Sequence, residues 1–207
     1  MKNSIQDFGH LVLAIKTVHE SFAAQAGRAV NISLTLRNWL IGAYIDEYKL
    51  HGADRAAYGD RLFVELAEQL AKLKVSNCNR RQLYRYLRFY RVYPDIVGTL
   101  SPQLREKLPY PLPAGSSARD KKVGTPPAQF GIPAHRLIQS LSYSHIELLV
   151  DLDDDLKRVF YEIECIRGNW SVRELKRQIA SLYYEHVTRD EYERFRKYVL
   201  NNPRNWV

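Results

Sequence analysis

The sequence predicts an all-α protein: a multi-helix domain that contains a helix-turn-helix and has two helical subregions joined by a loop rich in proline and glycine. Apolar residues recur at the three- and four-residue spacing of amphipathic helices along most of the 207 residues, and the strict alternation typical of β-strands is hard to find. Apolar residues make up 45% of the chain, which is typical of a globular protein with a hydrophobic core.

Four helices are expected within residues 1–100, the first predicted region. Gly27 ends the first helix, and Asn31, a favoured N-cap residue, begins the second. Pro94 limits the fourth, because the residue before a proline disfavours the helical conformation. The approximate bounds of these helices are 8–26, 31–51, 57–73 and 79–93.

Residues 101–133 differ in composition from the rest of the chain. They hold most of its prolines and several of its glycines. This composition predicts a linker or long loop between the two helical subregions. The sequence does not fix the conformation of residues 107–131.

Helical spacing resumes in residues 134–207, which are expected to pack on the first region. Ser171 and Glu174 have the spacing of a capping box, in which each side chain accepts a hydrogen bond from the other residue's backbone. One helix is expected to begin at His135 and a short second one at Ser142 or Ser144. Three further helices are expected over residues 153–166, 172–187 and 190–200.

Most of the positive charge lies in one short segment. The chain has a net charge of +8, and residues 72–91 carry seven basic residues and no acidic one. Surface helices normally mix the two signs so that neighbouring side chains attract each other. A local cluster of like charge is typical of proteins that bind a polyanion.

The segment 79–94 is predicted to be the helix that contacts this polyanion. The arginines occupy one face of the helix, and the opposite, apolar face consists of Leu83, Tyr86, Leu87, Tyr90 and Tyr93. The planar guanidinium group of arginine can bind a phosphate or a guanine edge through two hydrogen bonds. The candidate DNA-binding residues are Lys72, Lys74, Arg80, Arg81, Tyr84, Arg85, Arg88 and Arg91, with Arg81, Arg85 and Arg88 expected to contribute most.

The residues before this helix have the layout of a helix-turn-helix. A helix that ends near Leu73 is followed by the short segment KVSNC and then by the arginine-rich helix. In that arrangement the second helix enters the major groove of DNA and the first braces it across the backbone. The turn lacks the glycine that is frequent at this position.

Two alternatives remain open for the arginines. They could pair with acidic residues of the same fold, and the candidates on the preceding helix are Asp60, Glu65 and Glu68. They could instead dock an acidic partner protein, which would make the chain an interaction or assembly module. RNA is a further ligand, since charge alone does not separate it from DNA.

The sequence predicts no catalytic, cofactor-binding or metal-binding residues. Asp153–Asp155 followed by Glu174 and Lys176 fit the spacing of a metal-dependent nuclease site, but that chemistry needs adjacent strands and the pattern here is helical. The six histidines and two cysteines lack the spacing of metal ligands, and the cysteines are expected to be reduced thiols. His145 is expected to pack or hydrogen-bond locally.

Two long segments of the chain resemble the N-terminal domain of YhcG-like proteins, over residues 28–98 and 140–187. The first contains NISLTLRNWLIGAYIDEYKLHGADRAAYGDRLFVELAEQLAK and RRQLYRYLRFYRVYP, and the second is LSYSHIELLVDLDDDLKRVFYEIECIRGNWSVRELKRQIASLYYE. The second segment also resembles, more weakly, the region that follows the helix-turn-helix of ParB-type partition proteins. YhcG-like proteins usually carry a C-terminal PDDEXK nuclease domain, so the resemblance implies a DNA-binding or target-recognition unit of a nuclease-associated protein.

The function expected from the sequence is therefore that of a bacterial, cytoplasmic DNA-binding module with no enzymatic activity of its own. Nuclease activity would belong to a missing C-terminal domain or to a partner subunit. Duplex DNA is the expected partner, and a homodimer would bind palindromic half-sites. No membrane span is expected, because the longest apolar run near the N-terminus, Leu11–Ile15, is too short for one.

Overall fold

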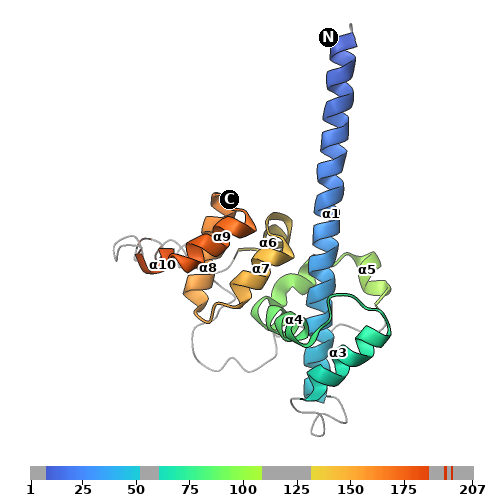
Figure 1. Ribbon diagram of the computed structural model, residues 1–207, viewed down its shortest axis with the longest axis vertical. Helices are drawn as coiled ribbons and strands as arrows, with labels where there is room; N and C mark the ends of the chain where they lie inside the picture. Colours follow the sequence, from blue (N-terminus) through green and yellow to red (C-terminus); the bar gives the residue numbers. More distant parts are fainter. Residues whose placement is uncertain (1–7, 52–60, 109–131, 187–193, 195–196, 198–207) are drawn as a thin grey trace.

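The computed structural model describes residues 8–51, 61–108, 132–186, 194 and 197, and its regular elements are all helices (Figure 1). The prediction of an all-α, multi-helix fold is confirmed. The elements are α1 (Phe8–His51), α3 (Leu62–Lys72), α4 (Arg80–Val92), the 3-10 helix η2 (Pro94–Thr99), α5 (Pro102–Glu106), α6 (Ala134–Ser140), α7 (Tyr143–Val150), α8 (Asp155–Arg167), α9 (Val172–Ala180) and α10 (Tyr183–His186).

Helix α1 is continuous over 44 residues, so the expected division into two helices was wrong. A glycine inside a helix costs only about 1 kcal/mol relative to alanine, which does not break the helix at Gly27. Asn31 does not cap a helix start. Its side-chain amide donates a hydrogen bond to the carbonyl oxygen of Leu141, at 3.4 Å. The N-terminal half of α1 projects beyond the other helices (Figure 1).

Helices α1 and α4 cross in close contact at Gly42. A Cβ atom added there would lie 2.0 Å from the carbonyl oxygen of Tyr86, so only glycine fits at this crossing. Nearby, the indole Nε1 of Trp39 donates a hydrogen bond of 2.9 Å to the carbonyl oxygen of Tyr93. The Trp39 ring also meets the Tyr90 ring edge-on, with 5.1 Å between centroids. Helix α4 is therefore held against α1 over most of its length.

Two clusters of buried apolar side chains form the core. The smaller cluster joins α1, α3 and α4, and the larger one joins α1 and α4 to η2 and to helices α6 to α9. The larger cluster thus contains residues from both expected helical regions, 1–100 and 134–207. The smaller cluster consists of Ile45, Phe63, Cys78, Leu83, Tyr86 and Leu87.

The C-terminal helices mostly begin where the sequence predicts. Ser142 is the N-cap of α7, and Gly168 follows the last residue of α8. Helix α9 ends at Ala180 instead of near residue 187, because Leu182 has a positive φ of 55° that interrupts the helix. The helix expected over 190–200 lies largely outside the described residues.

The region expected to be a loop contains one short helix. Helix α5 begins at Pro102, and the Ser101 hydroxyl caps it by accepting a hydrogen bond from the Leu104 amide at 3.2 Å. Residues 109–131, the larger part of that region, are outside the described chain. No helix in the described ranges is both long enough and apolar enough to cross a membrane.

Candidate nucleic-acid interface

The start of α4 is fixed by the turn that connects it to α3. The Val75 amide bonds to the Leu70 carbonyl oxygen and the Lys74 amide to that of Ala71, which closes α3 with a Schellman-type end. Lys74 has a positive φ of 56°, the conformation that glycine usually supplies in such turns. Asn79 is the N-cap of α4, and its side chain accepts a hydrogen bond from the Gln82 amide at 3.0 Å.

Helix α4 buries the predicted apolar face. Leu83, Tyr86, Leu87 and Tyr90 are buried as expected, and Phe89, which the helical projection did not include, is also fully buried. Phe89 is covered because α4 packs against α7 as well as against α1 and α3. The side of α4 that remains accessible is correspondingly narrow, and the arginines lie along it.

The accessible side of α4 lines an open groove of about 810 Å³. Six cationic side chains and a single carboxylate line it, so its surface is strongly positive. Lys49 reaches this groove from α1 and lies over the Phe63 ring, 5.3 Å from its centroid. The lining residues are Lys49, Arg80, Arg81, Tyr84, Arg85, Leu87, Arg88, Arg91 and Asp151.

Arg85 is held by two carboxylates, Glu147 of α7 and Asp151, the residue that follows this helix. One guanidinium nitrogen pairs with Glu147, and the other lies 2.7 Å from Asp151. Burial opposes the charge of Arg85, but hydrogen bonds and Coulombic attraction to Asp151 and Glu147 outweigh it and raise the pKa of the guanidinium group. Gln82 also donates to Glu147, at 3.0 Å. Arg85 therefore ties α4 to α7.

Arg88 and Arg91 also bind carboxylates of other elements. Arg88 lies 2.6 Å from Asp153, which follows α7, and Arg91 lies 2.8 Å from Asp46 of α1. The two pairs differ in burial, since the Asp153 side chain is 95% exposed and the Asp46 side chain only 1%. Both arginines keep about half of their own side chains exposed, so each can still meet a ligand.

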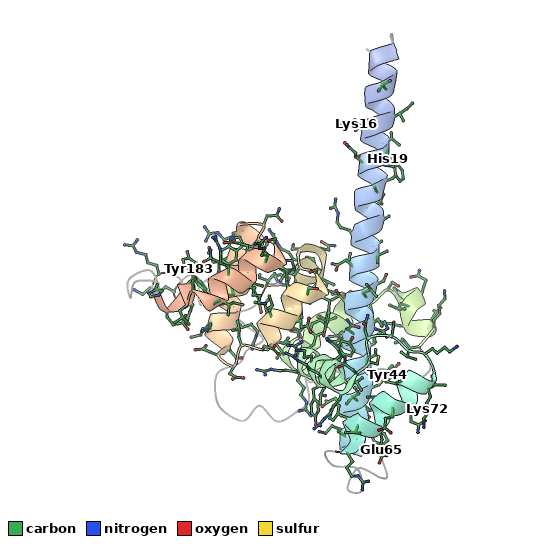
Figure 2. The ribbon with its side chains drawn as sticks, in the orientation of Figure 1. Lys16, His19, Tyr44, Glu65, Lys72 and Tyr183 are labelled. Atoms are coloured by element: carbon green, nitrogen blue, oxygen red, sulfur yellow. The ribbon has the colours of Figure 1, made fainter. Side chains whose placement is uncertain are left out.

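The cations at the start of α4 are arranged differently. Arg80 lies over the ring of Tyr84, 5.8 Å from its centroid, and Tyr84 stacks on Phe63. Arg80 and Arg81 are exposed, and neither forms an ion pair with a described carboxylate. The same holds for Lys72 and Lys74, which are exposed at the end of α3 and in the turn; Figure 2 shows Lys72 on the outer side of α3.

The predicted site residues thus divide into two groups. The groove includes all five arginines and Tyr84, whereas Lys72 and Lys74 lie outside its lining. Three of the arginines do pair within the fold, but with carboxylates of α1, α7 and the segment after α7. Of the acidic residues expected as partners, Glu65 and Glu68 pair with none of these arginines, and Asp60 lies outside the described residues.

Four further residues belong to this site although no local pattern predicted them: Lys49, Asp46, Glu147 and Asp151. Glu147 and Asp151 share one face of a helix four residues apart, a signal that fits an arginine-binding face but does not reveal which arginine. The partners of Arg85 lie 62 and 66 residues away along the chain, beyond the reach of any local pattern.

Helix α7, which holds Arg85, is itself anchored by His145. The Ser142 amide donates to His145 Nδ1 at 3.1 Å, and His145 Nε2 lies 3.1 Å from the Trp170 carbonyl oxygen. This pattern requires the neutral imidazole with its proton on Nε2. Burial lowers the pKa of His145, which favours the same neutral form. The prediction that His145 hydrogen-bonds locally is confirmed.

The C-terminal end of α4 contacts a buried network of charged side chains on α8. The Tyr93 hydroxyl donates a hydrogen bond of 2.6 Å to Glu162, and Arg158 Nε lies 3.9 Å from the same carboxylate. Glu162 is 2% exposed, and burial raises its pKa to about 7 despite these partners. Arg158 also pairs with Asp155.

The acidic residues that fit a nuclease spacing have other partners. Asp153 binds Arg88, Asp154 caps α8 and Asp155 binds Arg158. The expected capping box at α9 is only half formed: the Ser171 hydroxyl accepts from the Glu174 amide, but the Glu174 carboxylate binds Arg177 and Gln178 instead of the Ser171 amide. Within the described ranges, no three His, Cys, Asp or Glu side chains cluster as a metal site would require.

The family model of the DUF1016 N-terminal domain matches residues 14–111 and 128–186. The chain is 32% identical over 178 residues to a protein of Escherichia coli (strain K12) named "Putative nuclease YhcG". That alignment covers 81% of this chain and 43% of the relative, so the chain spans less than half of the relative's length. No solved structure matches.

Proposed function

The chain belongs to the DUF1016 N-terminal domain family, and on this premise we propose that it is the DNA-binding, target-recognition module of a nuclease-associated protein. Helices α3 and α4 act as a helix-turn-helix, and α4 presents its arginines to duplex DNA. The observation that carries this proposal is the open groove along α4, with six cations and one carboxylate in its lining.

The cations at the start of α4 supply the main phosphate contacts. Arg80, Arg81, Lys72 and Lys74 are exposed and have no carboxylate partner among the described residues, so their charge is available to a ligand. Neighbouring arginines on one helix repel each other, and a phosphate backbone relieves that repulsion. Tyr84 lies in the same lining, and its hydroxyl is a potential hydrogen-bond donor to a phosphate.

Arg85, Arg88 and Arg91 have a second role in the proposed interface. Their carboxylate partners fix the direction of each guanidinium group, which favours a defined geometry over a mobile one. Arg88 and Arg91 remain about half exposed and complete the groove, while Arg85, with 17% of its side chain exposed, mainly positions the helix. Nuclease activity is assigned to a domain or partner outside this chain.

A second candidate function is a protein-assembly module whose basic groove docks an acidic partner. The observation that favours it is that three arginines of the groove already bind carboxylate side chains, the groups that an acidic partner would present. The two functions differ in their dependence on salt and ligand. A DNA-binding groove binds random duplex DNA with a steep salt dependence, whereas an assembly groove binds a specific protein more tightly than it binds DNA.

The test is a fluorescence-anisotropy titration of duplex DNA over a series of salt concentrations. The native protein should give a log–log slope of roughly −3 to −6, and the double variant Arg80→Gln/Arg81→Gln should flatten it by about 1.8. The control is Arg167→Gln/Arg177→Gln, which removes the same charge from exposed positions on α8 and α9 outside the groove. Equal slopes for both variants would contradict the proposal, and a parallel titration with duplex RNA separates the two nucleic acids.

A further inference from the structure

A second pocket lies between α1, α4 and α7 and has a volume of about 250 Å³. It is separate from the arginine groove, because no described residue lines both. Gln82 and Tyr86, its two lining residues from α4, lie on the opposite side of that helix from Arg80 and Tyr84. The pocket opens to solvent beside Ser144, which is exposed.

Two polar atoms of the pocket lining are buried and have no hydrogen-bond partner among the described residues: Gln82 Oε1 and the Tyr143 hydroxyl. Gln82 Nε2 donates to Glu147 at 3.0 Å, which orients the amide so that Oε1 is the free atom. Burial raises the pKa of Tyr143, so its hydroxyl keeps the proton and can donate it to a ligand. Because a buried polar atom without a partner costs free energy, this pair favours a ligand that carries both a donor and an acceptor.

The rest of the lining combines amide groups with aromatic and apolar walls. Asn38 is buried, and the rings of Tyr86 and Tyr143 meet edge-on with 5.6 Å between centroids. Leu34 adds an aliphatic side chain. A nucleobase has the matching combination of flat apolar faces and a polar edge, and proteins bind single bases with Asn or Gln amides and aromatic rings. The pocket is slightly smaller than the roughly 300 Å³ at which sites for drug-sized ligands begin, so its size suits one base.

Arg37 gives the pocket a positive charge. Its guanidinium group donates to the Ser76 carbonyl oxygen at 2.9 Å and to Asn38 Oδ1 at 3.1 Å, and it forms no ion pair with a described carboxylate. A guanidinium group has five N–H donors, so donors remain for a phosphate. Glu147, the carboxylate in the lining, is already paired with Arg85. The charge available to a ligand is therefore positive.

We propose that this pocket binds one nucleobase together with the phosphate of the same nucleotide. The edge of the base bonds to Gln82 Oε1 and to the Tyr143 hydroxyl, its faces lie against the aromatic and apolar walls, and the phosphate meets Arg37. This site is additional to the groove along α4 and does not depend on DNA binding there. Two sources present this chemistry: a free mononucleotide and an unpaired nucleotide of a nucleic-acid strand.

The first test is isothermal titration calorimetry of the full chain with the common nucleoside monophosphates, each in its ribose and deoxyribose form. At least one should bind with a dissociation constant on the order of 100 μM, as suits a small ligand. Tyr143→Phe removes only a hydroxyl without a described partner, so it should preserve the melting temperature and weaken binding about three- to tenfold. The matched control is Tyr183→Phe on α10, outside the pocket lining, which should leave the affinity unchanged (Figure 2).

Two further variants distinguish the pocket from the arginine groove. Leu34→Trp fills the pocket from an exposed position on α1 and should abolish nucleotide binding, with circular dichroism as the check on folding. Arg80→Gln/Arg81→Gln changes the groove alone and should leave nucleotide binding unchanged while it weakens binding to duplex DNA. The nucleoside that lacks the phosphate should bind at least about threefold more weakly than its nucleotide, because it loses the contact with Arg37.

A single-stranded tetranucleotide separates the two sources of the base. A strand is the source if the tetranucleotide binds more tightly than every mononucleotide and Tyr143→Phe weakens it; otherwise the free nucleotide is the source.

The proposal is overturned if neither the mononucleotides nor the tetranucleotide bind, and the pocket then holds only water. Binding that both Tyr143→Phe and Leu34→Trp leave unchanged would overturn it as well, and loss of that binding in Arg80→Gln/Arg81→Gln would assign it to the groove. Equal affinity for nucleoside and nucleotide would overturn the role of Arg37.

Discussion

The two ends of α4 carry similar charge but differ in what surrounds it. At the N-terminal end, Arg80 and Arg81 are exposed and form no ion pair with a described carboxylate. Further along the helix, Arg85, Arg88 and Arg91 each bind a carboxylate from another part of the fold. The number of arginines in a sequence therefore overstates the charge that a ligand can meet, because some of that charge stabilises the protein itself.

The same comparison explains how one helix can serve two purposes. The arginines toward the C-terminal end tie α4 to α1, α7 and the segment after α7, which fixes the helix in the molecule. The arginines at the N-terminal end are then presented from a rigid support. A rigid element holds a binding site more accurately than a loop does.

The largest expected effect on stability comes from a substitution at the crossing of α1 and α4, because this crossing holds both ends of α4 in place. Gly42→Ala should lower the free energy of unfolding by about 3 kcal/mol or more, because its Cβ would collide with the Tyr86 backbone. Gly27→Ala is the matched control on the same helix: its Cβ would meet open space, and it should stabilise the protein by up to about 1 kcal/mol. Urea unfolding monitored by circular dichroism measures both, and similar effects of the two changes would contradict the close crossing of α1 and α4.

A pH-dependent effect is expected at the C-terminal end of α4. Burial raises the pKa of Glu162 to about 7 from an ordinary value of 4.5, so the folded state holds this proton more strongly than the unfolded state does. The stability from Glu162 is therefore fully present below pH 4.5 and is lost as the pH rises through 7, by up to about 3 kcal/mol.

Glu162→Gln should remove this loss and retain an acceptor for the Tyr93 hydroxyl. The free energy of unfolding is measured for the native protein and for Glu162→Gln at several pH values between 4.5 and 7.5. The value for the variant is then subtracted from that for the native protein at each pH. The difference cancels the opposite contribution of His145, whose lowered pKa reduces stability as the pH falls below its ordinary 6.5. A difference that does not change with pH would show that Glu162 titrates normally.

The two groups of arginines should differ in their effect on stability. Arg85→Gln should lower the free energy of unfolding by about 2 kcal/mol, because it leaves Glu147 and Asp151 without their partner. Arg81→Gln should stay within about 0.5 kcal/mol of the native protein, as is usual for an exposed side chain. Thermal unfolding of both variants checks this, and equal losses would remove the distinction between the two ends.

The smallest effect should come from freeing one of the paired arginines. Asp153→Asn removes an exposed carboxylate from Arg88 without disturbing the core. DNA affinity at low salt should then rise roughly two- to fivefold, which corresponds to the usual strength of an exposed ion pair. Unchanged affinity would place Arg88 outside the contact surface; Asp95→Asn, an exposed carboxylate that does not line the groove, serves as the control.

Much of the fold followed from local patterns in the sequence. The start of α4 near residue 79, the start of α7 after Ser142 and the end of α8 near residue 166 all rest on chemistry within a few residues, and the structure confirms them. The continuity of α1 did not follow, because the glycine penalty at Gly27 is small against the stability of a long helix and because Asn31 binds a residue far away in sequence.

The candidate site could be predicted only in part, for the same reason. The sequence places the arginines on one side of a helix, since their spacing is local. Their carboxylate partners Asp46, Asp151 and Asp153 lie on other elements that only the tertiary fold brings close. Only the packed structure therefore shows which arginines of α4 are neutralised by a carboxylate and which remain available to a ligand.

A DNA titration that compares the two ends of α4 distinguishes available from neutralised charge on this helix. The variants Arg80→Gln/Arg81→Gln and Arg88→Gln/Arg91→Gln remove equal charge from the same helix, and their salt slopes are measured beside that of the native protein. The first variant should flatten the slope by about 1.8, as expected for two lost phosphate contacts, and the second should flatten it by less than half as much. Equal flattening, a larger effect of the second variant, or a native protein without a salt-dependent affinity for duplex DNA would contradict this expectation.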